Sequence, residues 1–281
     1  MAAAEVVVPQ IRDDSMAGVK RDYKGNRKEG NPGLPKDVVR NEYTSMFESF
    51  RDSLDEHHDR RQKIGKVSRD VTALSKKIIF SLQRVRKLNE PIPQNISSEI
   101  EKRTKEIKEL LSTIEDDVAG LRRYQYSMPG IEEFVEAVSF AHYLETQTLI
   151  TPEQMQAALG DDVKIPITPA DYVFGLFDLT GEMMRFATAV TALSGAMPSG
   201  FMGEEGDNGR TILEDLQETA SMLQIVPPIS SKGWKDKKGV MIEQVRKVER
   251  VGYGVRVRGN ERPKGVGYDF DVGEETAPVM D

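Results

Sequence analysis

The stretch that decides the fold is TPADYVFGLFDLTGEMMRFATAVTAL, residues 168–193. It opens with a threonine, a proline and a first-turn acid, which together mark the start of a helix. Apolar side chains cover most of the surface that follows, so we expect this helix to be largely enclosed. Its few charged residues share one stripe, namely Asp171, Asp178, Glu182 and Arg185. The pattern predicts a buried helix with an acidic face.

Working outward, helical spacing and proline or glycine breakers divide the rest of the chain into six more helices. The first is very long, because no proline interrupts residues 41–87. The others are expected at about 97–126, 131–146, from 151 onward, 211–223 and around 240–251. No segment alternates with a period of two, so the prediction is an all-α protein with seven helices.

The ends of the chain differ from its middle. Residues 1–36 finish in the Gly- and Pro-rich stretch GNRKEGNPGLPK, and residues 261–281 are rich in glycine and charge. We expect a disordered arm over 1–36, a helical domain over 37–260 and a disordered tail over 261–281. The basic residues of the arm could form a nuclear import signal, although a solvated tail is the favoured interpretation.

Composition limits the class of protein. The 281 residues contain no cysteine, which excludes a disulfide framework and a thiolate nucleophile and fits a reducing compartment. No apolar run is long enough for a membrane span, and the N-terminus lacks the basic region of a signal peptide. We therefore expect no membrane partner and a cytoplasmic and nuclear location. No P-loop or dinucleotide-binding fingerprint is present.

Two pairs of acids lie on apolar helices. Glu133 and Glu136 are three residues apart, and Asp178 and Glu182 are four apart. Glu132 is expected to face solvent. Burying unpaired carboxylates together is costly, and a divalent cation would resolve the conflict. Oxygen ligands select magnesium, manganese or calcium. Spacing alone favours a structural alternative in which Arg185 neutralises the acids. A di-iron site is excluded because it needs Glu-x-x-His twice.

A basic stretch occupies the second half of the long helix. Ten lysines and arginines stand against one acid in residues 60–87, a net charge of +9 in a chain of −7. Such a stripe suits a polyanion, because cations bind phosphates by displacing counterions. A solvated coiled-coil face is the alternative. The candidate RNA-binding residues are Arg60, Arg61, Lys63, Lys66 and Arg69, with Arg122, Arg123 and Tyr124 for phosphate contact and base stacking.

Four segments carry a resemblance: HDRRQKIGKVSRDVTALSKKIIFSLQR (58–84), GIEEFVEAVSFAHYL (130–144), ITPADYVFGLFDLTGEMMR (167–185) and VERVGYGVRVRGNE (248–261). Over about residues 40–260 the chain resembles the translin family. The resemblance implies a seven-helix translin-type bundle. It also implies assembly with translin into a hetero-octamer that cleaves single-stranded or structured RNA with Mg²⁺ (or Mn²⁺), in RISC activation and the removal of tRNA-precursor fragments.

The resemblance also assigns the acids. The metal-binding catalytic acids of the family lie in Glu-x-x-Glu-Ala and Asp-Leu-Thr-Gly-Glu motifs, which correspond here to Glu133, Glu136, Asp178 and Glu182. Translin itself lacks this set, so the resemblance implies the catalytic subunit of an endoribonuclease, active only in complex with translin. Two alternatives stay open: a non-catalytic RNA-binding or assembly subunit, and a scaffold that uses the long helix as a coiled coil.

Overall fold

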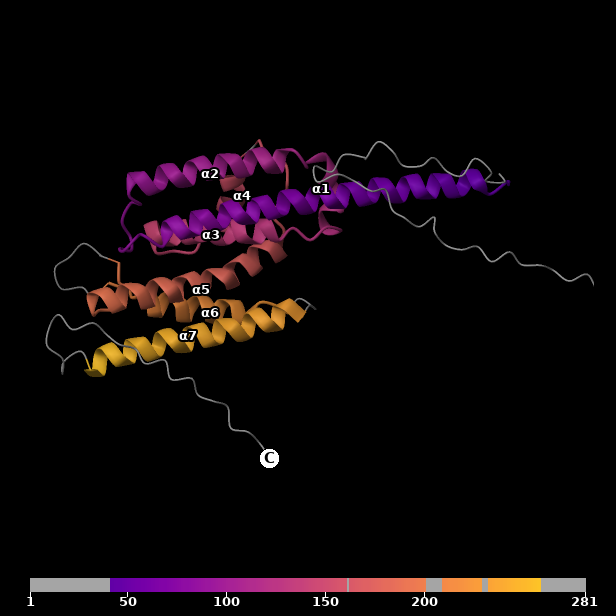
Figure 1. Ribbon diagram of the computed structural model, residues 1–281. Helices are drawn as coiled ribbons and strands as arrows, with labels where there is room; N and C mark the ends of the chain where they lie inside the picture. The colour runs from indigo at the N-terminus through magenta and orange to yellow at the C-terminus, as the bar shows by residue number, and fades with distance from the viewer. Residues whose placement is uncertain (1–40, 161, 201–208, 229–231, 259–281) are drawn as a thin grey trace, which may run out of the picture. The chain divides into compact units, whose positions relative to one another are not determined.

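The computed structural model describes residues 41–160, 162–200, 209–228 and 232–258 (Figure 1). The described chain is all-α, as predicted, with one isolated bridge between Ser199 and Thr211 as its only β pairing. Its helices are α1 (Thr44–Leu82), α2 (Gln94–Ser112), α3 (Pro129–Thr146), α4 (Pro152–Leu159), α5 (Pro169–Ser194), α6 (Ile212–Ile225) and α7 (Lys232–Arg258). The predicted arm over 1–36 and tail over 261–281 lie outside the described residues.

The chain divides into two compact units, residues 1–56 and 57–281. In the first unit the described residues form the beginning of α1. Asn41 Oδ1 accepts a hydrogen bond from Tyr43 N (3.0 Å) just before the helix begins. The large apolar side chains here, including Phe47 and Phe50, are mostly exposed. The second unit contains the rest of α1, all the other helices and every residue of the candidate site.

The limits of three predicted helices are wrong. α7 runs from Lys232 to Arg258 rather than around 240–251, and its first turn packs through Trp234 against Phe177. α1 ends at Leu82 rather than near Lys87, because its last turn tightens: Val85 N donates to the carbonyl of Leu82 (2.9 Å), three residues back. α2 ends at Ser112 rather than near Tyr126. Two short 3-10 helices follow it, Asp116–Val118 and Gly120–Tyr124; the extended residue Ala119 separates them, and the second begins at Gly120, whose φ is 61°. Continued α-helix is incompatible with that backbone.

Two glycines let α1, α3 and α5 approach closely enough to form the site. A Cβ on Gly130 would lie 2.4 Å from the carbonyl oxygen of Ser68, and Gly130 N donates to Ser68 Oγ (3.0 Å). A Cβ on Gly175 would lie 2.5 Å from a methyl carbon of Val135 and 2.9 Å from the carbonyl oxygen of Glu132. The acidic faces of α3 and α5 are therefore held together by backbone contact that no larger residue permits.

α5 is the central helix of the second unit and packs against α3, α6 and α7 (Figure 1). Ring contacts fasten it on two sides: Phe186 meets Phe140 of α3, and Phe177 meets Trp234 of α7, with centroids 6.4 and 5.1 Å apart. α5 is enclosed, as its apolar sequence predicts. Among the described residues, no helix is both long and apolar enough to cross a membrane.

Candidate acidic site on helices α3 and α5

The four acids singled out by the sequence lie on the facing helices α3 and α5. Glu136 and Glu182 are buried, with 8% and 7% of their surface exposed. Glu133 and Asp178 are half-buried, with side chains 21% and 35% exposed. None of the four is a freely solvated surface residue, which is unusual for glutamate and aspartate.

Glu136 is a buried carboxyl group that lacks a partner in the described part of the chain. Among the described residues it has no hydrogen bond and no ion pair. Its pKa is raised to about 8, chiefly because burial disfavours the ionised form. The nearby negative charges of Asp178, Glu133 and Glu182 add to this rise, in that order, and Lys237 opposes it. The four acids are thus close enough to repel one another.

The other three acids each have a partner. Lys76 of α1 pairs with Glu133 (3.3 Å), and Lys237 of α7 pairs with Asp178. Gln83, just after α1, donates through Nε2 to Glu182 Oε2 (2.9 Å). Arg185, which the structural alternative named as the neutralising residue, reaches only the edge of ion-pair distance from Glu182 (3.7 Å) and is 62% exposed. Arg185 therefore compensates this site weakly.

Lys237 is the functional candidate that the sequence analysis missed. It donates to Asp178, lies 3.7 Å from Glu132 Oε2 and sits over the ring of Phe174, 5.4 Å from its centroid. A signal was available, because Lys237 lies on the same face of α7 as the buried residues Trp234 and Met241. A lysine on a buried stripe needs an acidic partner on the helix it faces.

Glu132 was expected to face solvent, and that expectation is wrong. Its side chain is only 24% exposed and lies against Lys237. Its pKa is raised, mainly because burial disfavours the charged form, and Lys237 partly offsets this. The reason lies in the close contact at Gly175, which brings the α3 backbone at Glu132 against α5 and turns this carboxylate toward α7.

The donor set has the chemistry of a hard divalent cation, since it offers carboxylate oxygens on two facing helices. The buried and unpartnered Glu136, with like charges around it, is the observation that such a cation would explain. As the side chains lie, however, no group of three or more His, Cys, Asp or Glu residues within the described chain is arranged to hold a metal ion. Magnesium binding by the four acids remains a prediction.

Arg123 must be removed from the predicted RNA-binding set. It is buried, with 3% of its surface exposed. Its guanidinium donates to the carbonyl of Pro166 (3.1 Å) and to the carboxylate of Asp171. Because the guanidinium is buried and bonded to these two groups, it is not accessible to a phosphate. Asp171, predicted to share the acidic stripe, is likewise a structural residue.

The remaining basic candidates differ in accessibility. Arg61, Lys66 and Arg69 are exposed on α1. Lys63 pairs with Asp117 (2.7 Å), and Arg60 is half-buried with Nε 3.6 Å from the same aspartate. Arg122 is half-buried, and the ring of Tyr124 is 68% exposed. The basic face of α1 is therefore available to a ligand at three of its five predicted positions without breaking an ion pair. RNA binding by these residues stays a prediction.

The chain is similar in sequence to several known proteins. It is 29% identical over 245 residues to Translin-associated protein X of Rattus norvegicus, covering 78% of this chain and 80% of that protein, and matches the Mus musculus protein equally. It is 31% identical over 213 residues to the Translin-associated protein X homolog of Schizosaccharomyces pombe, covering 74% and 85%.

Two solved structures share the fold. AfC3PO superposes with a TM-score of 0.53 at 20% identity, covering 75% of this chain and 97% of that one. Apo-NeC3PO gives 0.50 at 17% identity, covering 74% and 96%. The translin family model itself matches residues 59–259. That match spans well over half of the sequence, includes all four acids and confirms the predicted resemblance: the chain belongs to the translin family.

Proposed function

We propose that this chain is the catalytic subunit of a magnesium-dependent endoribonuclease that works in complex with translin. The observation that carries the proposal is Glu136, a buried carboxylate with no partner among the described residues and with three other acids near it. A fold seldom retains such a group for stability, because replacing it with a neutral side chain would remove the penalty of burial. Strongly perturbed carboxyl groups cluster at functional sites for this reason.

In this proposal Glu133, Glu136, Asp178 and Glu182 would hold the cation through their carboxylate oxygens. Magnesium bound there would lower the pKa of a coordinated water and offset negative charge on the phosphate being cleaved. The protein supplies the arrangement: α3 and α5 fix the four acids, and Gln83 orients Glu182. Lys76 and Lys237 supply positive charge beside the site when no metal ion occupies it.

Single-stranded or structured RNA is the proposed substrate, drawn along α1 by Arg61, Lys66 and Arg69, which are exposed cations on its surface. Lys63 and Arg60 could join them at the expense of their contacts with Asp117. Tyr124, with its ring exposed, could stack on a base. The family resemblance suggests passenger-strand removal in RISC activation, or trimming of tRNA precursors, as the biological task.

The proposed partner is translin, because the curated relatives are named as translin-associated proteins. A hetero-octamer is the assembly that the family resemblance suggests. We place the complex in both cytoplasm and nucleus, a proposal that rests on the absence of cysteine and on the basic residues of the N-terminal arm. Exposed apolar residues at both ends of the described chain, including Phe47, Phe50 and Tyr253, offer surfaces for assembly.

The test is cleavage of a labelled single-stranded RNA by the chain co-purified with translin, first with Mg²⁺ and then with EDTA. Glu136→Gln and Asp178→Asn should each lower the cleavage rate by on the order of 100-fold or more, since each removes charge from the reacting centre. Glu109→Gln, an exposed acid on α2, is the matched control and should cleave like the parent. Full cleavage by both site variants would reject the proposal.

A second function, a non-catalytic RNA-binding or assembly subunit, is favoured by one observation. Three of the four acids already have an ion pair or a hydrogen bond within the chain, with Lys76, Lys237 and Gln83. It predicts RNA binding that weakens with salt and no cutting in Mg²⁺. Isothermal titration of the complex with Mg²⁺ separates the two functions, because only the catalytic one expects a heat of binding that Glu136→Gln abolishes.

A further inference from the structure

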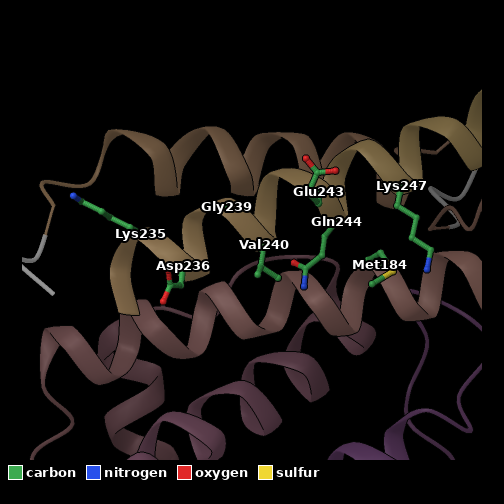
Figure 2. A pocket seen from close by; sticks show the side chains of 8 residues that line it. All are labelled: Met184, Lys235, Asp236, Gly239, Val240, Glu243, Gln244 and Lys247. Atoms are coloured by element: carbon green, nitrogen blue, oxygen red, sulfur yellow. The ribbon is translucent and has the colours of Figure 1, made fainter. Parts of the chain in front are cut away.

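A groove between α5 and α7 lies beside the acidic site and belongs to no role assigned so far. It has a volume of about 700 Å³, within the range of about 300–1,000 Å³ typical of ligand sites. Its lining comes from α7 except for Met184 of α5: Lys235, Asp236, Gly239, Val240, Glu243, Gln244 and Lys247. Figure 2 shows Val240, Gln244 and Lys247 directed from α7 toward α5, while Glu243 points away.

The groove and the acids share one helix. Asp178 of the acidic site and Met184 of the groove are six residues apart on α5, about 9 Å along the helix axis. Gly181 lies between them, and the Gln244 amide packs over it, since a Cβ there would lie 2.9 Å from Gln244 Nε2. The same two helices are joined at both places, by Lys237 with Asp178 and by Gln244 with Thr180. A chain-like ligand that reached the acids could continue into the groove.

The groove has an apolar wall, a side-chain amide fixed by a hydrogen bond, and a lysine. Met184 and Val240 supply the apolar surface. One end of the Gln244 amide is bonded to Thr180 Oγ1 (2.6 Å), and its other end has no partner within the described residues. Lys247 is half-buried and forms no ion pair with any described residue. Its neighbour Glu243 is already paired with Arg246 (2.7 Å) and points away.

The charge of α7 favours an anion at this place. Residues 232–258 contain nine lysines and arginines against three acids, a net charge of +6 (nine minus three) in a chain of −7. Two acids line the groove, Asp236 and Glu243, and Glu243 points away from it. Asp236 lies at the end of the groove opposite Lys247 (Figure 2). An anionic group therefore belongs at the Lys247 end, with its uncharged part between Met184 and Val240.

We propose that this groove binds one nucleotide of the RNA strand next to the bond that is cut, with the base between Met184 and Val240, the Gln244 amide on the edge of the base, and Lys247 on a neighbouring phosphate. The inference rests on the proposed function for its substrate class. Gln244 and Lys247 are then positioning residues, and the orientation of Gln244 is set by Thr180. An amide held at one end can select among bases, because each base edge presents a different donor and acceptor pattern.

Gly239 gives the sharpest test. A Cβ at this position meets no atom within 4 Å, so a larger side chain can fill the groove without disturbing the fold. Gly239→Phe, in the complex with translin, should raise KM for single-stranded RNA by about tenfold and leave kcat within about twofold, the pattern of lost ground-state binding. Ser221→Phe, which places the same ring at an exposed position of α6 outside the groove, is the matched control and should leave both within about twofold of the parent. Equal KM for the two variants would overturn the proposal.

Two more variants test the named contacts. Lys247→Met should weaken RNA binding measured in EDTA and lower its salt dependence by about 0.7 in log–log slope, whereas Arg250→Met, an exposed cation of the same helix outside the groove, should change binding less. Gln244→Leu and Thr180→Val should both flatten the base preference beside the cut in a randomised RNA pool. An unaltered cut-site profile in both, or loss of the complex with translin in Lys247→Met, would overturn the proposal.

The outcomes separate this proposal from the catalytic one. Binding in EDTA does not require cleavage, so Lys247→Met reports on the groove even if the parent complex fails to cut RNA. If the parent does not cut RNA but Lys247→Met still binds it less tightly than Arg250→Met, the catalytic proposal fails and the groove stands. If the parent cuts RNA and Gly239→Phe cuts it with unchanged KM, the catalytic proposal stands and the groove proposal fails.

Discussion

Helix α5 carries two buried acidic regions only two turns apart, and they are built in opposite ways. At its start, Asp171 accepts hydrogen bonds from Thr168 N (2.8 Å) and Thr168 Oγ1 (2.6 Å) and forms an ion pair with the buried Arg123. At its middle, Asp178 and Glu182 face Glu136, which has no partner among the described residues. The first region is fully compensated, and the second is not.

The comparison shows how a structural acid can be told from a functional one on the same helix. Asp215 on α6 follows the structural pattern, since it accepts from Tyr143 OH (2.7 Å) and Gln147 Nε2 (2.7 Å) and pairs with Arg210. Where this chain buries an acid for stability, it surrounds the acid with donors. Glu136 departs from that pattern, and this is why we assign it to function.

The largest expected effect breaks the compensated region. Arg123→Ala leaves Asp171 buried beside an empty space, and breaking a buried pair in this way costs about 3–5 kcal/mol. We expect the free energy of unfolding to fall by that amount in denaturant titration of the complex with translin. Cleavage per folded molecule should be unchanged, because Arg123 lies outside the acidic site. A loss of stability below about 1 kcal/mol would show that Asp171 does not depend on Arg123.

The next prediction concerns Glu136, whose replacement should raise the free energy of unfolding rather than lower it. Its pKa in the folded protein is about 8, above the ordinary 4.5. The folded state therefore holds the proton more tightly, so this group favours folding below pH 4.5 and loses that contribution as pH rises toward 8. Glu136→Gln keeps the neutral form. In EDTA it should be more stable than the parent by on the order of 2–3 kcal/mol above pH 8.

That gain should shrink as pH falls from 8 to 4.5 and should also shrink when Mg²⁺ is added to the parent. Thermal unfolding at a series of pH values measures both. Asp171→Asn serves as the contrast: it should be destabilised at every pH in this range, since its carboxylate is hydrogen-bonded in the fold. A Glu136→Gln protein less stable than the parent at pH 8 would place Glu136 with the structural acids.

A smaller effect concerns Lys237, the cation beside the uncompensated region. Lys237→Gln leaves Asp178 and Glu132 without their ion pair, which we expect to cost about 1–2 kcal/mol in EDTA for a pair of intermediate burial. Added Mg²⁺ should raise the melting temperature of this variant more than that of the parent, because the metal ion would then replace the missing charge. Lys238→Gln is the control, and an equal Mg²⁺ response in the two variants would contradict the prediction.

The smallest effect compares two capping boxes. Thr168 caps α5 in the buried region and Thr151 caps α4 at the surface, each with its partner three residues on. Thr168→Ala should cost about 2 kcal/mol and Thr151→Ala about 1 kcal/mol, since the first also removes a donor from buried Asp171. Unfolding in denaturant checks the ranking. Equal costs would mean that burial adds nothing to the Asp171 network.

Much of the fold could be predicted from local patterns. The starts of α4 and α5 follow from Thr-Pro and an acid, and the structure shows both capping boxes in place. Helix ends were harder to predict: α2 stops at Ser112 because its last turn tightens, with Thr113 N donating to the carbonyl of Leu110 (3.2 Å), three residues back. The apolar period continues beyond this point, but the α-helix does not. Periodicity reports which face is buried and is silent about where a 3-10 turn replaces an α turn.

The candidate site divides in the same way. The sequence by itself determined the all-α class, the enclosed α5 and the two pairs of acids, because spacing along a helix fixes which side chains share a face. Only the tertiary structure decided that Asp171 belongs to Arg123, that Lys237 reaches Asp178, and that Glu136 has no partner among the described residues. Those facts depend on which helices meet and how closely, and that approach is set by Gly130 and Gly175 across segments distant in sequence.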